Sequence, residues 1–167
     1  MSLVYIALGS NLGDRLENLR SAIRRLESSY PIRALRASSV YENRAVGMGE
    51  ADDFLNAVVE VETSLDPDSV LDACLAVELF LGRTRSKGGW APRTIDLDVI
   101  HFESVKMNTD RLTLPHPRIA ERDFVAVPLD DLISQRLVDG RSVNEIVSSL
   151  EIIDLKRTDL TLLDFHS

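Results

Sequence analysis

The 167-residue sequence has little of several features, and each shortage excludes a class of protein. Its single cysteine, Cys74, leaves no internal disulfide and favours a reducing, cytoplasmic setting. No apolar run approaches the ~18 residues of a membrane-spanning helix, and the segment from Met1 to Leu8 lacks the basic start of a secretory signal. Its 19 basic residues are outnumbered by 27 acidic ones, so the net charge of −8 argues against general nucleic-acid binding.

What is present is the composition of an ordinary globular protein, with 44% hydrophobic and 28% charged residues. The length suits one domain over residues 1–167, and no internal repeat, low-complexity segment or linker is visible. We therefore expect a cytoplasmic monomer whose partners are small molecules, with no nucleic-acid or membrane partner.

The most informative stretch runs over residues 83–100. Its first part contains four basic side chains and no acid: Arg83, Arg85, Lys87 and Arg93. Its second part has the pattern of a strand in which Asp96 and Asp98 alternate with apolar residues, so both carboxylates face the same way, about 7 Å apart. Carboxylate oxygens suit Mg²⁺, and basic groups suit phosphate oxygens. These residues favour phosphoryl or nucleotidyl transfer, but a solvated sheet face beside an exposed basic loop is an equal alternative.

Other positions also have both a chemical and a structural interpretation. Residues 43–53 form a loop of about ten residues, a length that is often functional. Phe54 and Asn56 share one strand face, which suits either a planar heterocycle or ordinary core packing. His116 lies between two prolines, where it is either a rigidly held imidazole suited to phosphate contact or proton transfer, or a simple turn residue. Glu78 lies off the apolar stripe of its helix, so it is either a plain exposed acid or a residue that contacts a ligand.

Apolar periodicity predicts the order strand, helix, strand, strand, helix, strand. The predicted ranges are a strand over 3–8, a helix over 14–29, strands over 32–41 and 54–63, a helix over 66–81 and a strand over 95–100. Residues 9–13 are a glycine-rich turn that either cradles phosphate or is simply tight, and the tight turn is favoured because they lack the glycine patterns of phosphate-binding loops. The order predicts an α+β fold with a ferredoxin-like β-α-β-β-α-β core. C-terminal elements, including a helix over 143–150, would cover the second face and complete a three-layer αβα sandwich.

Four segments, in this order and spacing, resemble the 6-hydroxymethyl-7,8-dihydropterin pyrophosphokinase family of the folate pathway. They are YIALGSNL from Tyr5, FLNA from Phe54, WAPRTIDLDVI from Trp90, and LPHPR from Leu114 with ERDF following at Glu121. Together they cover roughly residues 3–132. The family transfers a pyrophosphoryl group from ATP to the hydroxymethyl group of the pterin and releases AMP.

The resemblance implies that Asp96 and Asp98 hold two Mg²⁺ ions that bridge the ATP phosphates. It implies that Arg83 and Arg93 are catalytic and contact phosphates. The ATP-binding positions that it implies are Glu78, Arg85, Trp90, Arg93, Arg111, Thr113, His116 and Arg122. The pterin-binding positions that it implies are Asn43, Val46, Phe54, Asn56, Trp90 and Phe124. The pterin ring would lie between Phe54 and Phe124, and loops 43–53 and 83–92 are similar to the family's mobile lids.

Two positions depart from the family pattern. Gly89 stands where the family often has a basic residue, and Phe54 stands where it often has tyrosine, which keeps the ring and loses the hydroxyl. Two alternatives also remain from the residues themselves. One is another Mg²⁺-dependent nucleotide transferase, and the other is a non-catalytic ferredoxin-like ligand-binding module.

Overall fold

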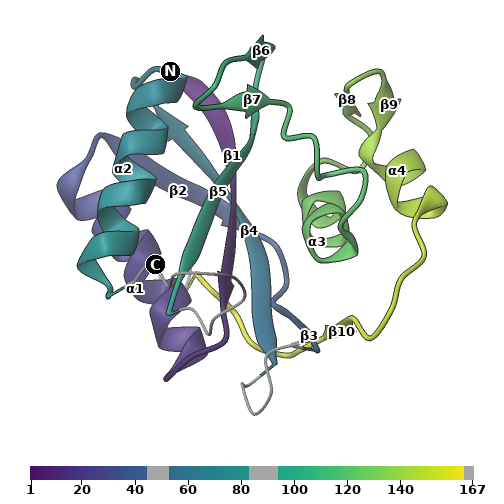
Figure 1. Ribbon diagram of the computed structural model, residues 1–167, viewed down its shortest axis with the longest axis horizontal. Coiled ribbons are helices and arrows are strands. Elements are labelled where there is room, and N and C mark those ends of the chain that lie inside the picture. The colour runs from purple at the N-terminus through teal and green to yellow at the C-terminus, as the bar shows by residue number, and fades with distance from the viewer. Residues whose placement is uncertain (45–52, 83–93, 164–167) are drawn as a thin grey trace.

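The structure is a computed structural model, and it describes residues 1–44, 53–82 and 94–163. This part of the chain combines an antiparallel sheet with α-helices (Figure 1). The elements are β1 Ser2–Ser10, α1 Arg15–Ser29, β2 Ile32–Ala37, β3 Tyr41–Asn43, β4 Phe54–Thr63, α2 Pro67–Phe80, β5 Asp96–Phe102, β6 Met107–Asn108, β7 Thr113–Leu114, α3 Asp123–Ile133, β8 Leu137–Val138, β9 Arg141–Ser142, α4 Val143–Ser149 and β10 Lys156–Arg157. None of the described helices is long and apolar enough to cross a membrane.

The main sheet has the strand order β10-β3-β4-β1-β5, and β2 also pairs with β4. Every pairing within it is antiparallel. The continuous apolar run of β1 predicts a buried central strand, and this is confirmed, because Val4, Tyr5 and Ile6 are fully buried.

Each face of the sheet packs against a pair of helices. Alternate β4 residues point to opposite faces, as the pattern predicts. Leu55, Ala57 and Val59 join a core cluster with α1 and α2, whereas Val58 joins a separate cluster with α3 and α4. Figure 1 shows α1 and α2 on one side of the sheet and α3 and α4 on the other.

The ends of the first two helices follow the capping signals in the sequence. The Asp14 carboxylate accepts a hydrogen bond from Glu17 N at 3.2 Å, and the Asp66 carboxylate accepts one from Ser69 N at 2.8 Å. Gly82, just beyond α2, has a φ of +90°, which is a conformation that glycine adopts without strain. The predicted helix bounds are therefore confirmed to within about one residue.

One predicted strand is wrong in its continuity. The segment predicted as a single strand over 32–41 is divided into β2 and β3, with residues 38–40 between them. Ser38 explains the break, because its N–H donates to Val58 O at 2.8 Å while its hydroxyl accepts from Val58 N at 2.9 Å. A side-chain oxygen thus replaces a main-chain partner, and the strand shifts its pairing on β4.

Candidate functional site

Three neighbouring strands bring the predicted pterin and metal residues into register. Gly9 on β1 is paired with Asn56 on β4 and with Asp96 on β5. Neighbouring strands lie about 4.8 Å apart, so the backbones of Asn56 and Asp96 are about 10 Å apart across the sheet. In the next row, Ala7 is paired with Val58 and Asp98. One sheet face therefore places an amide and two carboxylates around a residue without a side chain.

The orientation of the Asp-x-Asp strand agrees with its alternation. Leu97 and Val99 are buried in the cluster with α1 and α2, on the opposite face. Asp96 is half-buried and Asp98 is exposed, while Ile100 on their face packs toward α3. The prediction that both carboxylates project together from one face is therefore confirmed.

Gly9 is a site residue that sequence reasoning missed. A Cβ atom built there would lie 3.0 Å from the Asn56 side-chain oxygen and 3.9 Å from Cδ1 of Phe54. A contact of 3.0 Å is tighter than about nine in ten real Cβ contacts, so with any side chain at residue 9 the Asn56 amide would have to shift by a few tenths of an ångström. The interpretation of residues 9–13 as a tight turn is wrong for Gly9 and Ser10, because β1 extends to Ser10. A glycine inside a strand often marks close approach of a ligand or neighbouring group.

The predicted pterin residues that the structure describes lie on two walls. On one wall, Asn56 is buried and its side-chain nitrogen donates to the Asn43 side-chain oxygen, and Asn43 is itself paired with Phe54. On the other wall, Phe124 is half-buried at the beginning of α3. Two further predicted contacts, Val46 and Trp90, lie outside the described residues.

Arg122 and Phe124 lie together at the beginning of α3. The Arg122 guanidinium carbon is 5.6 Å from the centre of the Phe124 ring, which is within cation–π range. A residue predicted to bind ATP is thus adjacent to one predicted to bind the pterin. The arrangement fits a site in which phosphates and a ring meet at the same helix end.

The backbone of His116 is hydrogen-bonded to β5, and a second hydrogen bond fixes the orientation of its ring. Its N–H donates to Ile100 O at 2.8 Å, and its Nδ1 accepts from Arg118 N at 3.1 Å. The neutral ring therefore carries its proton on Nε2, which is left as the donor. Burial lowers the pKa of His116, with Asp98 opposing the shift and Arg122 reinforcing it. Asp98 and Arg122 are thus each within electrostatic reach of His116.

Glu78 is buried, so its interpretation as an exposed acid is wrong. Its side chain is 3% exposed, and its Oε2 accepts a hydrogen bond from Leu97 N at 3.0 Å. Leu97 lies between Asp96 and Asp98, and its N–H points away from β1 toward α2. The carboxylate of Glu78 therefore binds the outer edge of β5 midway between the two aspartates.

Arg111 and Thr113 contact α2 and β6, respectively. Arg111 is exposed and forms ion pairs with Asp72 and with Asp68, the latter at 3.6 Å between Nη1 and Oδ1. The hydrogen bond to Asp72 raises the pKa of Arg111. The Thr113 hydroxyl donates to the side-chain oxygen of Asn108 at 3.1 Å. The remaining predicted phosphate contacts, Arg83, Arg85 and Arg93, lie outside the described residues, so their roles stay predictions.

Arg15 is a second residue whose place the sequence did not indicate. Its Nη1 donates to Glu42 Oε2 at 2.7 Å and to Asp53 O at 2.6 Å. It therefore ties the end of β3 to the residue before β4, beside the Asn43–Asn56 pair. The pattern gave no signal, because both partners are distant in sequence.

Comparisons with known proteins found a matching family profile and similar curated proteins. The profile of the 7,8-dihydro-6-hydroxymethylpterin-pyrophosphokinase family matches residues 5–134. A 2-amino-4-hydroxy-6-hydroxymethyldihydropteridine pyrophosphokinase from Methylorubrum extorquens is 36% identical over 159 residues, covering 95% of this chain and 100% of that protein. The protein of the same name from Bacillus subtilis is 42% identical over 134 residues, covering 80% of each chain.

The fold is also found among solved structures. The crystal structure of Plasmodium falciparum HPPK-DHPS A437G has a TM-score of 0.68 at 12% identity, covering 88% of this chain and 45% of that one. This likeness shows the fold alone, whereas the profile and the two relatives extend over most of the sequence. The chain belongs to the 7,8-dihydro-6-hydroxymethylpterin-pyrophosphokinase family.

Proposed function

We propose that the protein transfers a pyrophosphoryl group from ATP to 6-hydroxymethyl-7,8-dihydropterin, forming the pterin diphosphate and AMP in folate biosynthesis. The observation that carries the proposal is the row of Asn56, Gly9 and Asp96 across three paired strands. In a chain of this family, that row places the predicted pterin contact about 10 Å from the predicted metal ligand. The hydroxymethyl group of a bound pterin would then reach toward the phosphates.

Asn43, Asn56, Phe54 and Phe124 would bind the pterin. The amide of Asn56 is oriented by its hydrogen bond to Asn43, so donors and acceptors are presented to the ring edge in a fixed direction. Phe54 and Phe124, from β4 and α3, supply apolar surface for stacking. Burial of the Asn56 side chain keeps water from competing for these hydrogen bonds.

Asp96 and Asp98 would hold two Mg²⁺ ions together with phosphate oxygens of ATP. The two side chains fit the ligand preference of Mg²⁺, because both supply hard oxygen atoms from one strand face. No group of three or more His, Cys, Asp or Glu side chains among the described residues could hold a metal. Phosphates and water would therefore complete the coordination, as is usual for Mg²⁺. When bound, the metal neutralises phosphate charge and orients the reacting groups.

The remaining residues would position and neutralise the triphosphate. His116 offers its Nε2–H as a hydrogen-bond donor, and its lowered pKa keeps the ring neutral near pH 7. Arg122 offers its guanidinium from the beginning of α3. In the reaction, the pterin hydroxyl oxygen bonds to the β-phosphorus, and the bond from that phosphorus to the α,β-bridging oxygen breaks. AMP is then the leaving group.

We also propose that the core has ferredoxin-like topology within a three-layer αβα arrangement. The strand order β5-β1-β4-β2 in the sheet supports it. The core strands, which are β1, β2, β4 and β5 in chain order, then lie side by side as in a split β-α-β fold. Packing of α1 and α2 on one face and of α3 and α4 on the other supports the three layers.

A product assay tests the proposed function. Enzyme, MgATP and 6-hydroxymethyl-7,8-dihydropterin should release AMP in equal amount to the pterin diphosphate, and AMP should not form when the pterin is omitted. Asp98→Asn, which removes the charge of an exposed carboxylate and creates no core cavity, should abolish AMP formation with unchanged thermal unfolding. ADP as the product would indicate a simple kinase, and AMP formation with a different acceptor would indicate another nucleotide transferase.

A further inference from the structure

The segment after α4 has no role in the site described so far. Residues 151–163, called the C-terminal strap here, lie beyond the residues matched by the family profile. Apart from the two-residue strand β10, the strap contains no helix or strand. Figure 1 shows it leaving α4, passing beside β3 at the edge of the sheet and returning toward α1. Because most of its residues are exposed, its hydrogen bonds show what it holds.

The strap is attached first to the beginning of α3. Ile153 N donates to Asp123 Oδ2 at 3.1 Å. Asp123 is the first residue of α3 and lies between Arg122 and Phe124 in the sequence. The Ile153 side chain is exposed, so the attachment at this point is the backbone hydrogen bond. This end of the strap therefore holds the wall that contains Phe124.

The strap is attached next to β3. Lys156 and Arg157 pair with Glu42 and Tyr41, and this antiparallel pairing makes β10 the last strand of the sheet. Beyond it, Thr158 donates twice to Val40 O, from its N at 2.9 Å and from its hydroxyl at 2.8 Å. Since β3 ends at Asn43, this part of the strap holds the wall that contains Asn43 and its partner on β4.

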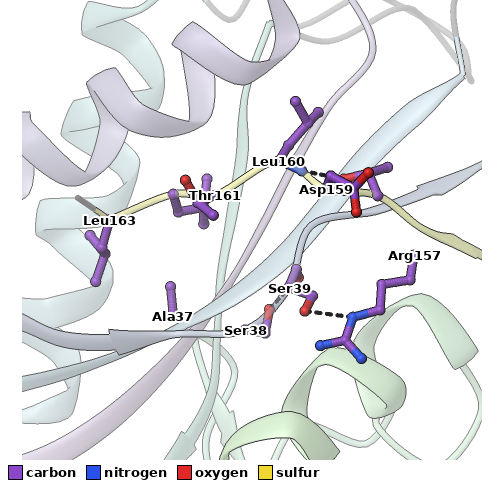
Figure 2. Close-up of a pocket in the computed structure, with 10 residues that line it drawn as sticks. Ala37, Ser38, Ser39, Arg157, Asp159, Leu160, Thr161 and Leu163 are labelled. Atoms are coloured by element: carbon purple, nitrogen blue, oxygen red, sulfur yellow. Dashed lines mark hydrogen bonds between the residues drawn. The ribbon is translucent and has the colours of Figure 1, made fainter. Parts of the chain in front are cut away.

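Beside β3, directional hydrogen bonds rather than apolar packing hold the strap. A cavity of about 490 Å³ lies between residues 157–163 and residues 37–39, and Figure 2 shows Arg157 reaching Ser39 beside it. Arg157 Nε donates to the Ser39 hydroxyl at 2.8 Å. Only farther on, at Leu162, does the strap enter the core. Loss of the hydrogen bonds to Val40 should therefore release β3 without opening the core.

The two attachments are joined by very little chain. From Ile153 to Lys156 an extended chain spans at most about 10 Å, and Asp154 shortens this further with a left-handed φ of +54°. The Asp154 carboxylate also lies 3.8 Å from Arg44 Nε, next to Asn43. The strap thus limits the separation between the start of α3 and the end of β3.

We infer that the C-terminal strap is a positioning element for the pterin substrate, because it joins the wall that contains Phe124 to the wall that contains Asn43. This inference rests on the proposed function. Strand β3 has only three residues and would otherwise be an unpaired edge, so it would fray readily. With β10 paired to it, the amide contacts of one wall and the aromatic contact of the other stay at a fixed separation.

Two pairs of matched variants test the strap in the full-length chain. Thr158→Pro removes both donors to Val40, whereas Thr158→Ser keeps both. Ile153→Pro removes the donor to Asp123, whereas Ile153→Ala keeps it and changes only an exposed side chain. Leu162→Ala is the stability control, because it opens a cavity in the core beyond the attachments.

Steady-state kinetics and pterin binding with a non-hydrolysable ATP analogue are measured for all five variants. Thr158→Pro and Ile153→Pro should each raise the KM and Kd for the pterin about five- to tenfold, as expected for loss of one or two hydrogen bonds, while KM for ATP changes less than about twofold. Thr158→Ser and Ile153→Ala should match the unaltered protein. Leu162→Ala should lower the unfolding temperature and leave the ratio of the two KM values unchanged.

Two results would overturn the inference. One is an equal change in the KM for ATP and the KM for the pterin in the proline variants. The other is a rise in the KM for the pterin alone in Leu162→Ala. Either result would show that the strap is a general stabiliser of the fold. If the unaltered protein forms no AMP from ATP and pterin, the proposed function fails instead. Hydrogen exchange of the β3 amides then still tests the attachment, because it must be faster in Thr158→Pro than in Thr158→Ser, and equal rates refute it.

Discussion

Gly9 shows how a single missing side chain shapes the candidate site. It lies in the row between an amide on β4 and a carboxylate on β5, and its neighbours approach to 3.0 Å of the place where a Cβ would be. The sequence alone assigns Gly9 to a turn, although it lies in β1, because the glycine pattern does not reveal which strands lie beside it. By contrast, strict alternation predicts that Asp96 and Asp98 share a face, since one apolar face fixes the register.

We predict that Gly9→Ala weakens pterin binding more than ATP binding. The added Cβ would displace the Asn56 amide from its hydrogen bond to Asn43, so the KM for the pterin should rise about tenfold, which corresponds to about 1.4 kcal/mol. Kinetics with each substrate varied in turn would measure this. Gly140→Ala is the control, because it imposes strain at a φ of +85° with nothing within 4 Å of the new Cβ. A pterin KM that rises equally in both variants would contradict the assignment.

At the scale of elements, β5 is an edge strand whose outer side needs a partner. Glu78 provides one by accepting from Leu97 N, so a side chain of α2 replaces a neighbouring strand at the position between the two aspartates. Helical periodicity places Glu78 on α2 but cannot indicate this bond, because the donor lies 19 residues later in the chain. The division of β2 from β3 by Ser38 was missed for the same reason, whereas the helix caps were predicted because their signals are local.

We predict that Glu78→Ala lowers both stability and turnover, whereas Glu78→Gln largely preserves them. Alanine leaves the buried Leu97 N–H without this acceptor, which costs about 1–3 kcal/mol, and it loosens the strand segment that carries the aspartates. Glutamine keeps an acceptor oxygen of similar reach. Chemical unfolding and kcat for the two variants would separate these outcomes. If Glu78 instead acts on ATP through its charge, Glu78→Gln would raise the KM for ATP as much as Glu78→Ala does.

At the scale of the whole molecule, a polar network ties the centre of the sheet to the α3 side. The Tyr5 hydroxyl donates to Glu60 Oε2 at 2.6 Å, and Arg36 binds both oxygens of Glu60, at 3.0 and 2.7 Å. Arg36 also donates to Leu132 O at 3.2 Å, and Arg136 donates to the Tyr5 hydroxyl at 3.1 Å. One buried carboxylate thus connects β1, β2, β4 and α3 on the face that also carries the site. Composition and alternation place Glu60 on a strand but give no sign of its two partners, Tyr5 and Arg36.

This network predicts how the stability of the fold depends on pH. The hydrogen bond from Arg36, with that from Tyr5, lowers the pKa of Glu60 in the folded protein. Because the pKa of Glu60 is lower in the folded protein, the unfolded chain takes up the proton at a higher pH than the folded one. The stabilisation is therefore complete above the pKa of the unfolded chain, about 4.3, and is lost as pH falls toward the pKa of the folded protein. Burial lowers the pKa of His101 and of His116, so these residues also reduce stability as pH falls below about 6.5.

We therefore predict that Glu60→Gln costs about 2 kcal/mol at pH 7 and progressively less below pH of about 4.3. Glutamine keeps the shape but removes the charge that the Arg36 fork binds, and hydrogen bonds to charged groups contribute about 1.5–3 kcal/mol. Urea unfolding at a series of pH values gives the difference between the two proteins directly. Glu62→Gln, two residues along the same strand face and only half-buried, is the matched control and should cost little at any pH. A Glu60→Gln difference that stays constant from pH 7 to pH 3 would show that the stabilisation comes from packing, because only a charge-dependent contribution can be titrated away.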